Sequence, residues 1–276
     1  MTYEKFETES EETKVINLDH VDSGKSWDFG KVSHDYAKYR DIYNERFFKT
    51  ILKYNIGTEG QTVLDLGTGS GVIPRYMTAL VPNTKWIGTD ISAEQIEAAK
   101  LLTDNPNISY LVCPANQIPF AENTFNAVTA CQCFWYFPVE TTIPEIYRVL
   151  KKGGRFAILS MIGLPRESEI LAKSEELVLK YNPNWNGNDF DRVKPCPPDW
   201  LDEKFAVVDL QEYVEDLEFT RESWCGRMRA CRGVGASLPQ NLIEEYDKEH
   251  YEALCKITSE TFTIPHQCIF KIFEKI

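Results

Sequence analysis

Three groups of residues in this chain have the types and spacing of a binding site for a nucleotide-like cofactor. In the first, at 63–71, the run Val-Leu-Asp-Leu-Gly-Thr-Gly-Ser-Gly takes an apolar segment into an acid and a Gly-x-Gly-x-Gly turn. The following segment, 72–80, has a helical pattern. A strand, a tight turn and a helix N-terminus in this order are the usual cradle for such a cofactor in α/β proteins. The candidate contacts are Asp65, Gly67, Thr68, Gly69 and Gly71.

The glycine spacing indicates which kind of cofactor this turn holds. A dinucleotide fingerprint, Gly-x-Gly-x-x-Gly, requires its third glycine at position 72, where this chain has Val72. The spacing therefore disfavours a nicotinamide-dependent dehydrogenase. A carboxylate beside the turn suits a cofactor that has an amino-acid tail and no phosphate.

The second group surrounds Asp90, which ends a strand expected at 85–89. A carboxylate at this place can accept hydrogen bonds from both hydroxyls of a ribose. The alternative is that Asp90 only caps the next helix, but Ser92 with Gln95 three residues later already forms a capping box. We therefore interpret Asp90 as a ribose ligand and add Ile91 and Gln95 to the candidate cofactor site.

The third group consists of the segment 113–126, the run Ala-Cys-Gln-Cys-Phe-Trp-Tyr-Phe at 130–137, and Leu-Lys-Lys-Gly-Gly at 150–154. Together with the turn at 63–71, these segments resemble the motifs of the class I S-adenosylmethionine (SAM) methyltransferases. The resemblance is closest to the type 11 methyltransferases, a group that includes quinone-biosynthesis and trans-aconitate methyltransferases. It is strong over about residues 32–161 and loose over the rest of the chain.

The resemblance implies SAM as the cofactor and S-adenosyl-L-homocysteine as its product. It adds Ala115, Asn116 and Gln132 to the expected cofactor contacts. Pro114 stands where the family has an acid that accepts a hydrogen bond from the adenine amino group. Asn116 or a backbone carbonyl is the expected substitute for that acceptor.

An N-terminal segment, Asp-Tyr-Ala-Lys-Tyr-Arg at 35–40, fits the same resemblance, with Asp41 where the family often has proline. In such enzymes this helix lies over the methionine end of the cofactor. Arg40 would then pair with the cofactor carboxylate, and Tyr36 would line the methyl-transfer face. The alternative is an amphipathic helix with a solvated arginine.

Alternating strand and helix patterns predict an α/β protein with a Rossmann-like, doubly wound, mainly parallel sheet. The resemblance implies seven strands, the last of them antiparallel, and a lid insertion follows the fifth strand. We expect helices at 31–54, 72–80, 92–103, 138–150, 221–232 and 239–257, and strands at 62–66, 85–90, 108–113, 126–131, 155–161, 205–219 and 264–273. The chain then divides into a polar lead-in (1–26), a cofactor-binding core (27–162), a lid or substrate insertion (163–203) and the rest of the core (204–276).

Methyl transfer from a sulfonium is an in-line displacement, so the protein mainly aligns the reactants and excludes water. The segment after the fourth expected strand, 132–135, lacks the Asn-Pro-Pro-Tyr or Asp-Pro-Pro-Tyr motif of enzymes that methylate amino groups of DNA and proteins. The expected acceptor is therefore a small molecule. Candidate acceptor contacts are Tyr39, Cys133, Trp135, Tyr136, Trp185, Trp224 and Arg227.

The catalytic group is unknown at this stage, because a base is needed only if the acceptor loses a proton. Candidates are Tyr36, Cys133 and His266. Each has a plainer alternative: the cysteine as an inert wall, the histidine as a structural residue, and the aromatic side chains as core. The arginines of the helix at 221–232 either bind an acidic acceptor or pair with carboxylates at the surface.

The composition limits the remaining possibilities. With 276 residues, 43% of them hydrophobic, the chain can bury one full core. Its net charge of -12 argues against a partner with a phosphate backbone. It has neither an apolar run long enough for a membrane helix nor a secretory signal, and the eight cysteines lack zinc-site spacing, so we expect no metal and a cytoplasmic location. RNA or protein methylation and a non-catalytic SAM-binding role remain the alternatives, and the acceptor and oligomeric state stay open.

Overall fold

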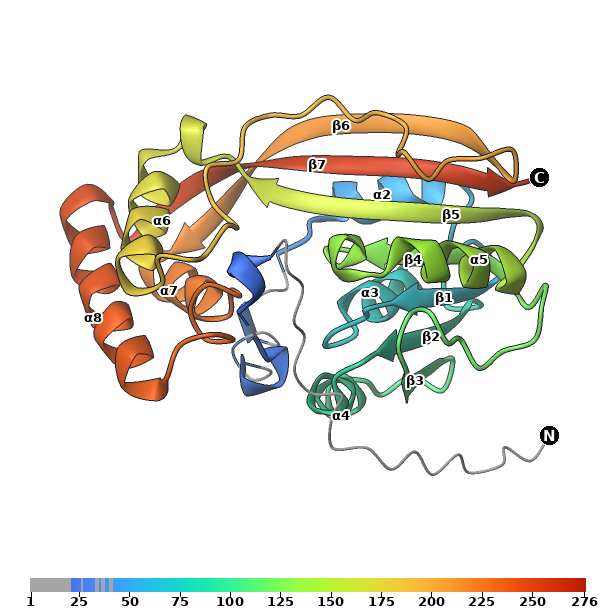
Figure 1. The fold of residues 1–276 in the computed structure, drawn as a ribbon, viewed down its shortest axis with the longest axis horizontal. Coiled ribbons are helices and arrows are strands. Elements are labelled where there is room, and N and C mark those ends of the chain that lie inside the picture. The colour runs from blue at the N-terminus through green and yellow to red at the C-terminus, as the bar shows by residue number, and fades with distance from the viewer. Residues whose placement is uncertain (1–20, 26, 33–34, 36–37, 40–41) are drawn as a thin grey trace.

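The fold is built on one seven-stranded sheet with the strand order β3-β2-β1-β4-β5-β7-β6 (Figure 1). The computed structural model describes residues 21–276 except 26, 33–34, 36–37 and 40–41. The strands are β1 (Thr62–Leu66), β2 (Lys85–Asp90), β3 (Ile108–Val112), β4 (Phe125–Cys131), β5 (Leu150–Gly163), β6 (Phe205–Thr220) and β7 (Thr261–Lys275). The helices of at least two turns are α2 (Glu45–Lys53), α3 (Val72–Leu80), α4 (Ala93–Leu101), α5 (Val139–Val149), α6 (Glu169–Tyr181), α7 (Arg221–Arg229) and α8 (Gln240–Ile257).

The strand directions confirm the predicted fold class. Strands β1 to β5 pair in parallel, β7 pairs antiparallel with β5, and β6 pairs antiparallel with β7. The chain order reverses between β1 and its two neighbours β2 and β4, and ligands of open α/β sheets bind at such a switch point. The glycine turn after β1 lies at this point of the sheet.

Alternation along β1 separates two cores, one on each face of the sheet. Val63 packs into the cluster that contains side chains of α2 and α3, such as Phe47 and Met77. Its neighbour Leu64 points to the other face, into the cluster that contains Ile146 of α5. Successive side chains of a strand face opposite sides, so this short apolar run is buried on both.

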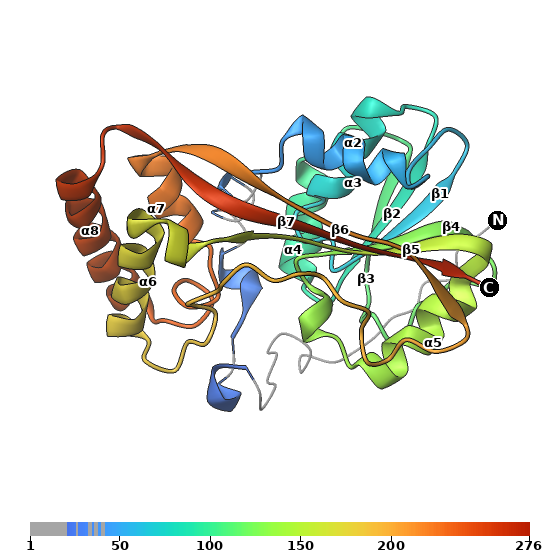
Figure 2. The same cartoon turned by 90° about the horizontal axis from the view of Figure 1, so that it is seen from above.

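The long strands β5, β6 and β7 continue past the parallel part of the sheet and carry α6, α7 and α8 at their far end (Figures 1 and 2). The segment 21–32 lies between this helical lobe and the parallel strands. Its backbone is held on the lobe side by a 3.0 Å hydrogen bond from the N–H of Asp28 to the carbonyl of Ala236. On the other side, the amide of Gln95 donates to the carbonyl of Phe29 at 3.1 Å.

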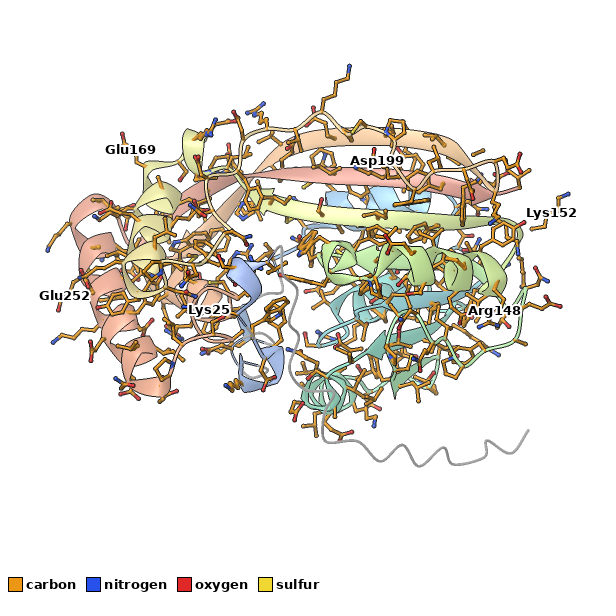
Figure 3. All side chains as sticks on the ribbon, viewed as in Figure 1. Lys25, Arg148, Lys152, Glu169, Asp199 and Glu252 are labelled. Carbon is orange, nitrogen blue, oxygen red and sulfur yellow. The ribbon has the colours of Figure 1, made fainter. Side chains whose placement is uncertain are left out.

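The outer surface of both ends is charged. Figure 3 shows Glu252 on the outer side of α8 and Lys152, near the start of β5, at the opposite end of the molecule. Both residues are exposed. Within the described residues, no helix has the length and apolar character needed to cross a bilayer.

Two local predictions differ from the structure. The single helix expected at 31–54 is interrupted: Asp35, Lys38 and Tyr39 are helical, residues 42–44 are not, and α2 begins at Glu45. Asn44 ends the preceding non-helical segment by accepting the N–H of Phe47 at 3.1 Å, which is the geometry of an N-cap. The helix α6 was not predicted at all. Ser168 caps it, and Leu171, Leu177 and Val178 form its buried face. The division of the chain into domains stays a prediction.

Ser174 of α6 joins the three helices of the lobe. Its hydroxyl donates to the carbonyl of Ile170 at 2.8 Å and lies 2.9 Å from Trp224 Nε1 of α7 and from His250 Nε2 of α8. The hydroxyl hydrogen of Ser174 is already donated to Ile170, so Trp224 Nε1 and His250 Nε2 must both donate to the hydroxyl oxygen. A neutral imidazole carries one proton, and the second nitrogen of His250 therefore carries none. That Nδ1 atom is buried without a hydrogen-bond partner among the described residues. Burial, with a smaller contribution from Arg229, lowers the pKa of His250 to about 4.

Acidification is therefore expected to weaken the lobe through His250. The folded pKa of about 4 lies below the ordinary value of 6.5, so only the unfolded chain takes up this proton as the pH falls from 6.5 to 4. The native protein should lose up to about 3 kcal/mol of unfolding free energy through this group across that window. His250→Gln keeps a donor for Ser174 and cannot titrate. Urea unfolding at each pH should show the native protein losing its advantage over the variant, whereas parallel profiles would contradict the assignment.

Candidate active site

The turn between β1 and α3 is closed by backbone conformations that favour glycine. Gly69 has φ 55°, and Gly71, the residue that precedes α3, has φ 77°. The N–H of Thr68 donates to the carbonyl of Thr89 at 2.8 Å, which holds the start of the turn against the end of β2. Because the glycines have no Cβ, the backbone of the turn can approach a ligand closely.

Asp90, at the end of β2, holds the same turn from the other side. Its Oδ2 accepts the N–H of Gly69 at 2.9 Å, and its Oδ1 accepts the N–H of Ser92 at 2.9 Å. Burial raises the pKa of Asp90, while these backbone donors oppose the rise. Each carboxylate oxygen can accept a second hydrogen bond, so Asp90 retains the capacity for two ligand hydroxyls.

Asp65, near the end of β1, is buried and accepts hydrogen bonds from other side chains of the protein. Its carboxylate accepts the hydroxyls of Thr68 at 2.7 Å and Thr129 at 2.6 Å, which ties β1, the turn and β4 together. Burial raises the pKa of Asp65 to about 6, the two hydroxyls oppose the rise, and the charge of Asp90 adds to it. Asp65, Thr68 and Arg227 line a small cavity of about 20 Å³.

A cavity of about 300 Å³ lies over the turn and the ends of β2 and β4. Most of the predicted cofactor contacts that the structure describes line it: Gly67, Gly69, Asp90, Ile91, Gln95, Ala115, Asn116 and Gln132. Sequence reasoning missed Phe29, Phe137, Pro138 and Arg232, which complete its walls. Phe137 ends a motif that was recognised and Pro138 follows it, whereas nothing in the sequence connects Phe29 with this site. The predicted contacts Tyr36 and Arg40 lie outside the described residues.

A second cavity of about 440 Å³ lies on the lobe side of the first. The predicted residues that line it are Gln132, Trp135, Tyr136, Trp185, Trp224, Arg227 and His266. Sequence reasoning missed Glu175, Asn186, Phe190 and Met228, among others, because they belong to elements whose contact with the site depends on the tertiary fold. Among the described residues, four line both cavities: Gln132, Trp135, Tyr136 and Arg232. The two cavities therefore meet at the carboxyl end of β4.

Gln132 holds this meeting point in an uncommon conformation. Its φ of 61° is in the left-handed region, which few residues other than glycine adopt. Its N–H donates to the carbonyl of Leu159 at 2.9 Å, and its side-chain amide donates to the carbonyl of Met161. Both bonds join β4 to β5 and fix the backbone where the two cavities join. Such local strain is found most often at functional sites.

Three predicted contacts have different roles in the structure. Tyr39 lines neither large cavity: its ring lies against Gly226 of α7 and its hydroxyl donates to Glu222 at 3.2 Å. Cys133 lines the first cavity, but its thiol donates to the carbonyl of Leu66 at 3.1 Å, and burial raises its pKa well above the ordinary value. It therefore fits an inert wall and not a nucleophile. Asn116 uses its amide nitrogen on Thr141 at 3.2 Å, which leaves its oxygen as an acceptor.

Two arginines after Thr220, Arg229 and Arg232, pair with carboxylates, which is one of the two roles considered for them. Arg229 pairs with Asp35 at 2.9 Å and Asp247 at 2.6 Å, and Arg232 lies 3.3 Å from Asp22. Arg227 is buried and lines the second cavity. Within the described part of the chain, no three His, Cys, Asp or Glu side chains gather as a metal site would require.

Comparison with known proteins agrees with this geometry. Residues 64–158 match the family model Methyltransf_11, a methyltransferase domain. This part of the chain belongs to that family. The family binds SAM, which confirms the resemblance and the cofactor expected from the sequence.

Curated relatives of this methyltransferase domain match over part of their length. The ubiquinone/menaquinone biosynthesis C-methyltransferase UbiE of Desulfotalea psychrophila is 41% identical over 102 residues, which are 35% of this chain and 40% of the relative. The protein of the same name from Klebsiella pneumoniae is 29% identical over 57% of this chain and 64% of its own length. The matched part thus spans less than two thirds of either relative.

Among solved structures, a Bacillus halodurans protein assigned as a methyltransferase has the same fold. Its TM-score is 0.52 at 20% identity, and the match covers 84% of this chain and 99% of that protein. At this identity the likeness concerns the fold alone. The family segment 64–158 itself ends within β5 and does not include the helices of the lobe.

Gly71 and Gly60 offer a matched test of the turn, since both have φ 77°. A Cβ on Gly71 would lie 2.2 Å from the hydroxyl of Tyr110, which is itself fixed 2.9 Å from Thr103 Oγ1, whereas a Cβ on Gly60 would meet nothing within 4 Å. Gly60→Ala should cost about 1–2 kcal/mol for the left-handed backbone alone. Gly71→Ala should cost roughly 1–3 kcal/mol more from overpacking. Urea unfolding measures both, and equal losses would mean that Tyr110 does not constrain the turn.

Proposed function

We propose that this chain is a SAM-dependent methyltransferase that methylates a small molecule. The observation that carries the proposal is the pair of adjoining cavities that share Gln132, Trp135, Tyr136 and Arg232. One cavity is bounded by the glycine turn and Asp90, and the other by apolar and aromatic side chains of the helical lobe. A donor in the first cavity and an acceptor in the second would meet at the end of β4.

The first cavity fits the cofactor in its donors and acceptors. Asp90 retains lone pairs for the two ribose hydroxyls, and the backbone of Gly67 and Gly69 leaves room for a close approach. The place of Pro114 offers no side-chain acceptor to the adenine amino group, but the oxygen of the neighbouring Asn116 does. When bound, SAM supplies a methyl group that is already activated. The residues around it then have to orient that group toward the second cavity and keep water out.

The second cavity supports an acceptor of metabolite size with a planar or apolar body. Its volume of about 440 Å³ is in the range of small-molecule sites. The indole rings of Trp185 and Trp224 are buried in its walls, and Met161 and Leu171 add aliphatic surface. The net charge of -12 also disfavours an RNA substrate. Quinone biosynthesis, named for two relatives, involves acceptors with such a planar body.

Asp90→Asn tests the place of the cofactor. The amide retains the shape of the side chain but removes the charge, so we expect S-adenosylhomocysteine to bind about 10- to 100-fold more weakly, as for the loss of charge-assisted hydrogen bonds. Isothermal titration calorimetry gives the affinity. The control is Asp104→Asn, an exposed acid just after α4, which should bind normally. An unchanged affinity in Asp90→Asn would place the ribose elsewhere.

The activity itself is tested with SAM that carries a radiolabelled methyl group. The purified protein is incubated with a cell extract that has been separated into metabolite, RNA and protein fractions. We expect label in the metabolite fraction, and heat-denatured protein serves as the control. Label that enters RNA or protein would overturn the acceptor class, and cofactor binding without any transfer would favour a non-catalytic role.

A further inference from the structure

Glu175 of α6 is a buried acid in the wall of the second cavity. Glu175 is only 8% exposed, and its Oε2 accepts the backbone N–H of Asp189 at 2.9 Å. Among the described residues, no nitrogen of a basic side chain lies within the 4.0 Å of an ion pair with this carboxylate. Within the described part of the chain, this carboxylate has no second hydrogen-bond donor, and Glu175 lines the cavity.

Burying such an acid lowers the stability of the fold, and the one hydrogen bond it accepts offsets little of that loss. A carboxylate that leaves water without a cationic partner is strongly disfavoured. Accordingly, burial raises the pKa of Glu175 to about 7, the negative charge of Asp189 adds to the rise, and the N–H of Asp189 opposes it. A glutamine could accept the same N–H without this cost. The hydrogen bond to the loop therefore does not explain why an acid is present.

The groups that share the cavity with Glu175 come from every element around it. His266 of β7 and Arg227 of α7 line the same cavity, as does Arg232, which pairs with Asp22. Asp189 itself pairs with Arg166 at the surface. His266 has a structural explanation that Glu175 lacks: it is buried in the core, packs against Phe219 and has its Nδ1 2.9 Å from the carbonyl of Ile264.

We propose that Glu175 accepts the proton that the methyl acceptor loses, and that this acceptor is a planar, phenol-like molecule with an acidic hydroxyl. The inference rests on the proposed function and extends it to the chemistry of the acceptor. A phenolic hydroxyl has an ordinary pKa of about 10, so a base that titrates near neutral pH is well matched to it. The tryptophans in the cavity wall suit the flat ring.

The proposed step is balanced within the protein and its two reactants. A lone pair of the acceptor oxygen forms the new O–CH₃ bond while the S–CH₃ bond of the cofactor breaks. The electrons of the broken bond remain on the sulfur of S-adenosylhomocysteine. The hydroxyl proton moves to the carboxylate of Glu175, which returns it to water after the product leaves.

The test measures the rate of label transfer from methyl-labelled SAM to the metabolite fraction between pH 5.5 and 8.5. In the native protein the rate should rise about tenfold per pH unit below pH 7 and then level off, because the protonated acid cannot accept a proton. Glu175→Gln should be about 10²- to 10⁴-fold slower and should lose that rise. Glu175→Asp should keep part of the rate together with the rise. The control is Glu176→Gln, an exposed neighbour paired with Lys173, which should behave as the native protein does.

Two further readouts separate the possible failures. Binding of S-adenosylhomocysteine should stay within twofold in all variants, and the labelled product should resist mild base, as a methyl ether does and a methyl ester does not. Native-like rates and pH dependence in Glu175→Gln would overturn the role of Glu175, as would slower transfer with an unchanged pH profile. A base-labile product would overturn the acceptor class. No transfer by the native protein would instead overturn the proposed function, and this inference with it.

Discussion

The site depends on the hydrogen bonds that the carboxylate of Asp65 accepts. It is buried at the end of β1 and accepts the hydroxyls of Thr68 and Thr129, so it fixes the turn to the neighbouring strand β4. With the turn held there, the N–H of Gly69 reaches Asp90 at the end of β2. Two acids at adjacent strand ends thus shape the backbone of one loop. The cost of burying them is offset by hydrogen bonds that exist only in this arrangement.

The two cavities are formed by different parts of the sheet. The parallel strands β1, β2 and β4 end at the first cavity, while the long antiparallel strands carry the helices that close the second. Ser174 joins those helices through Trp224, whose ring also lines the second cavity. Packing within the lobe therefore shapes the second cavity. Such a division lets one cofactor site serve different acceptors.

The sequence predicted best what is encoded locally. The turn at 63–71 and the strands around it follow from an apolar run and glycine spacing, and the seven strands with an antiparallel last strand follow from the family resemblance. The helix expected at 31–54 is interrupted at 42–44, where Asn44 caps a separate helix, because apolar spacing alone does not show such an interruption. Glu175 could not be recognised, because α6 was missed and one acid in a charged helix gives no sign that it is buried.

The partial prediction of the second cavity has the same origin. Trp185 and Trp224 were expected there from residue type alone, and the fold brings them together. Tyr39 was expected for the same reason, but it lies against α7 outside the cavity. Aromatic residues are as common in cores as in binding sites, so only the three-dimensional arrangement decides between these roles.

A crystal structure of the protein with S-adenosylhomocysteine tests the central claim most directly. The account predicts that both ribose hydroxyls bind the carboxylate of Asp90 and that the sulfur lies at the end of β4, beside Gln132 and facing the larger cavity. A ligand bound away from the glycine turn, or one whose sulfur faces away from that cavity, would contradict it.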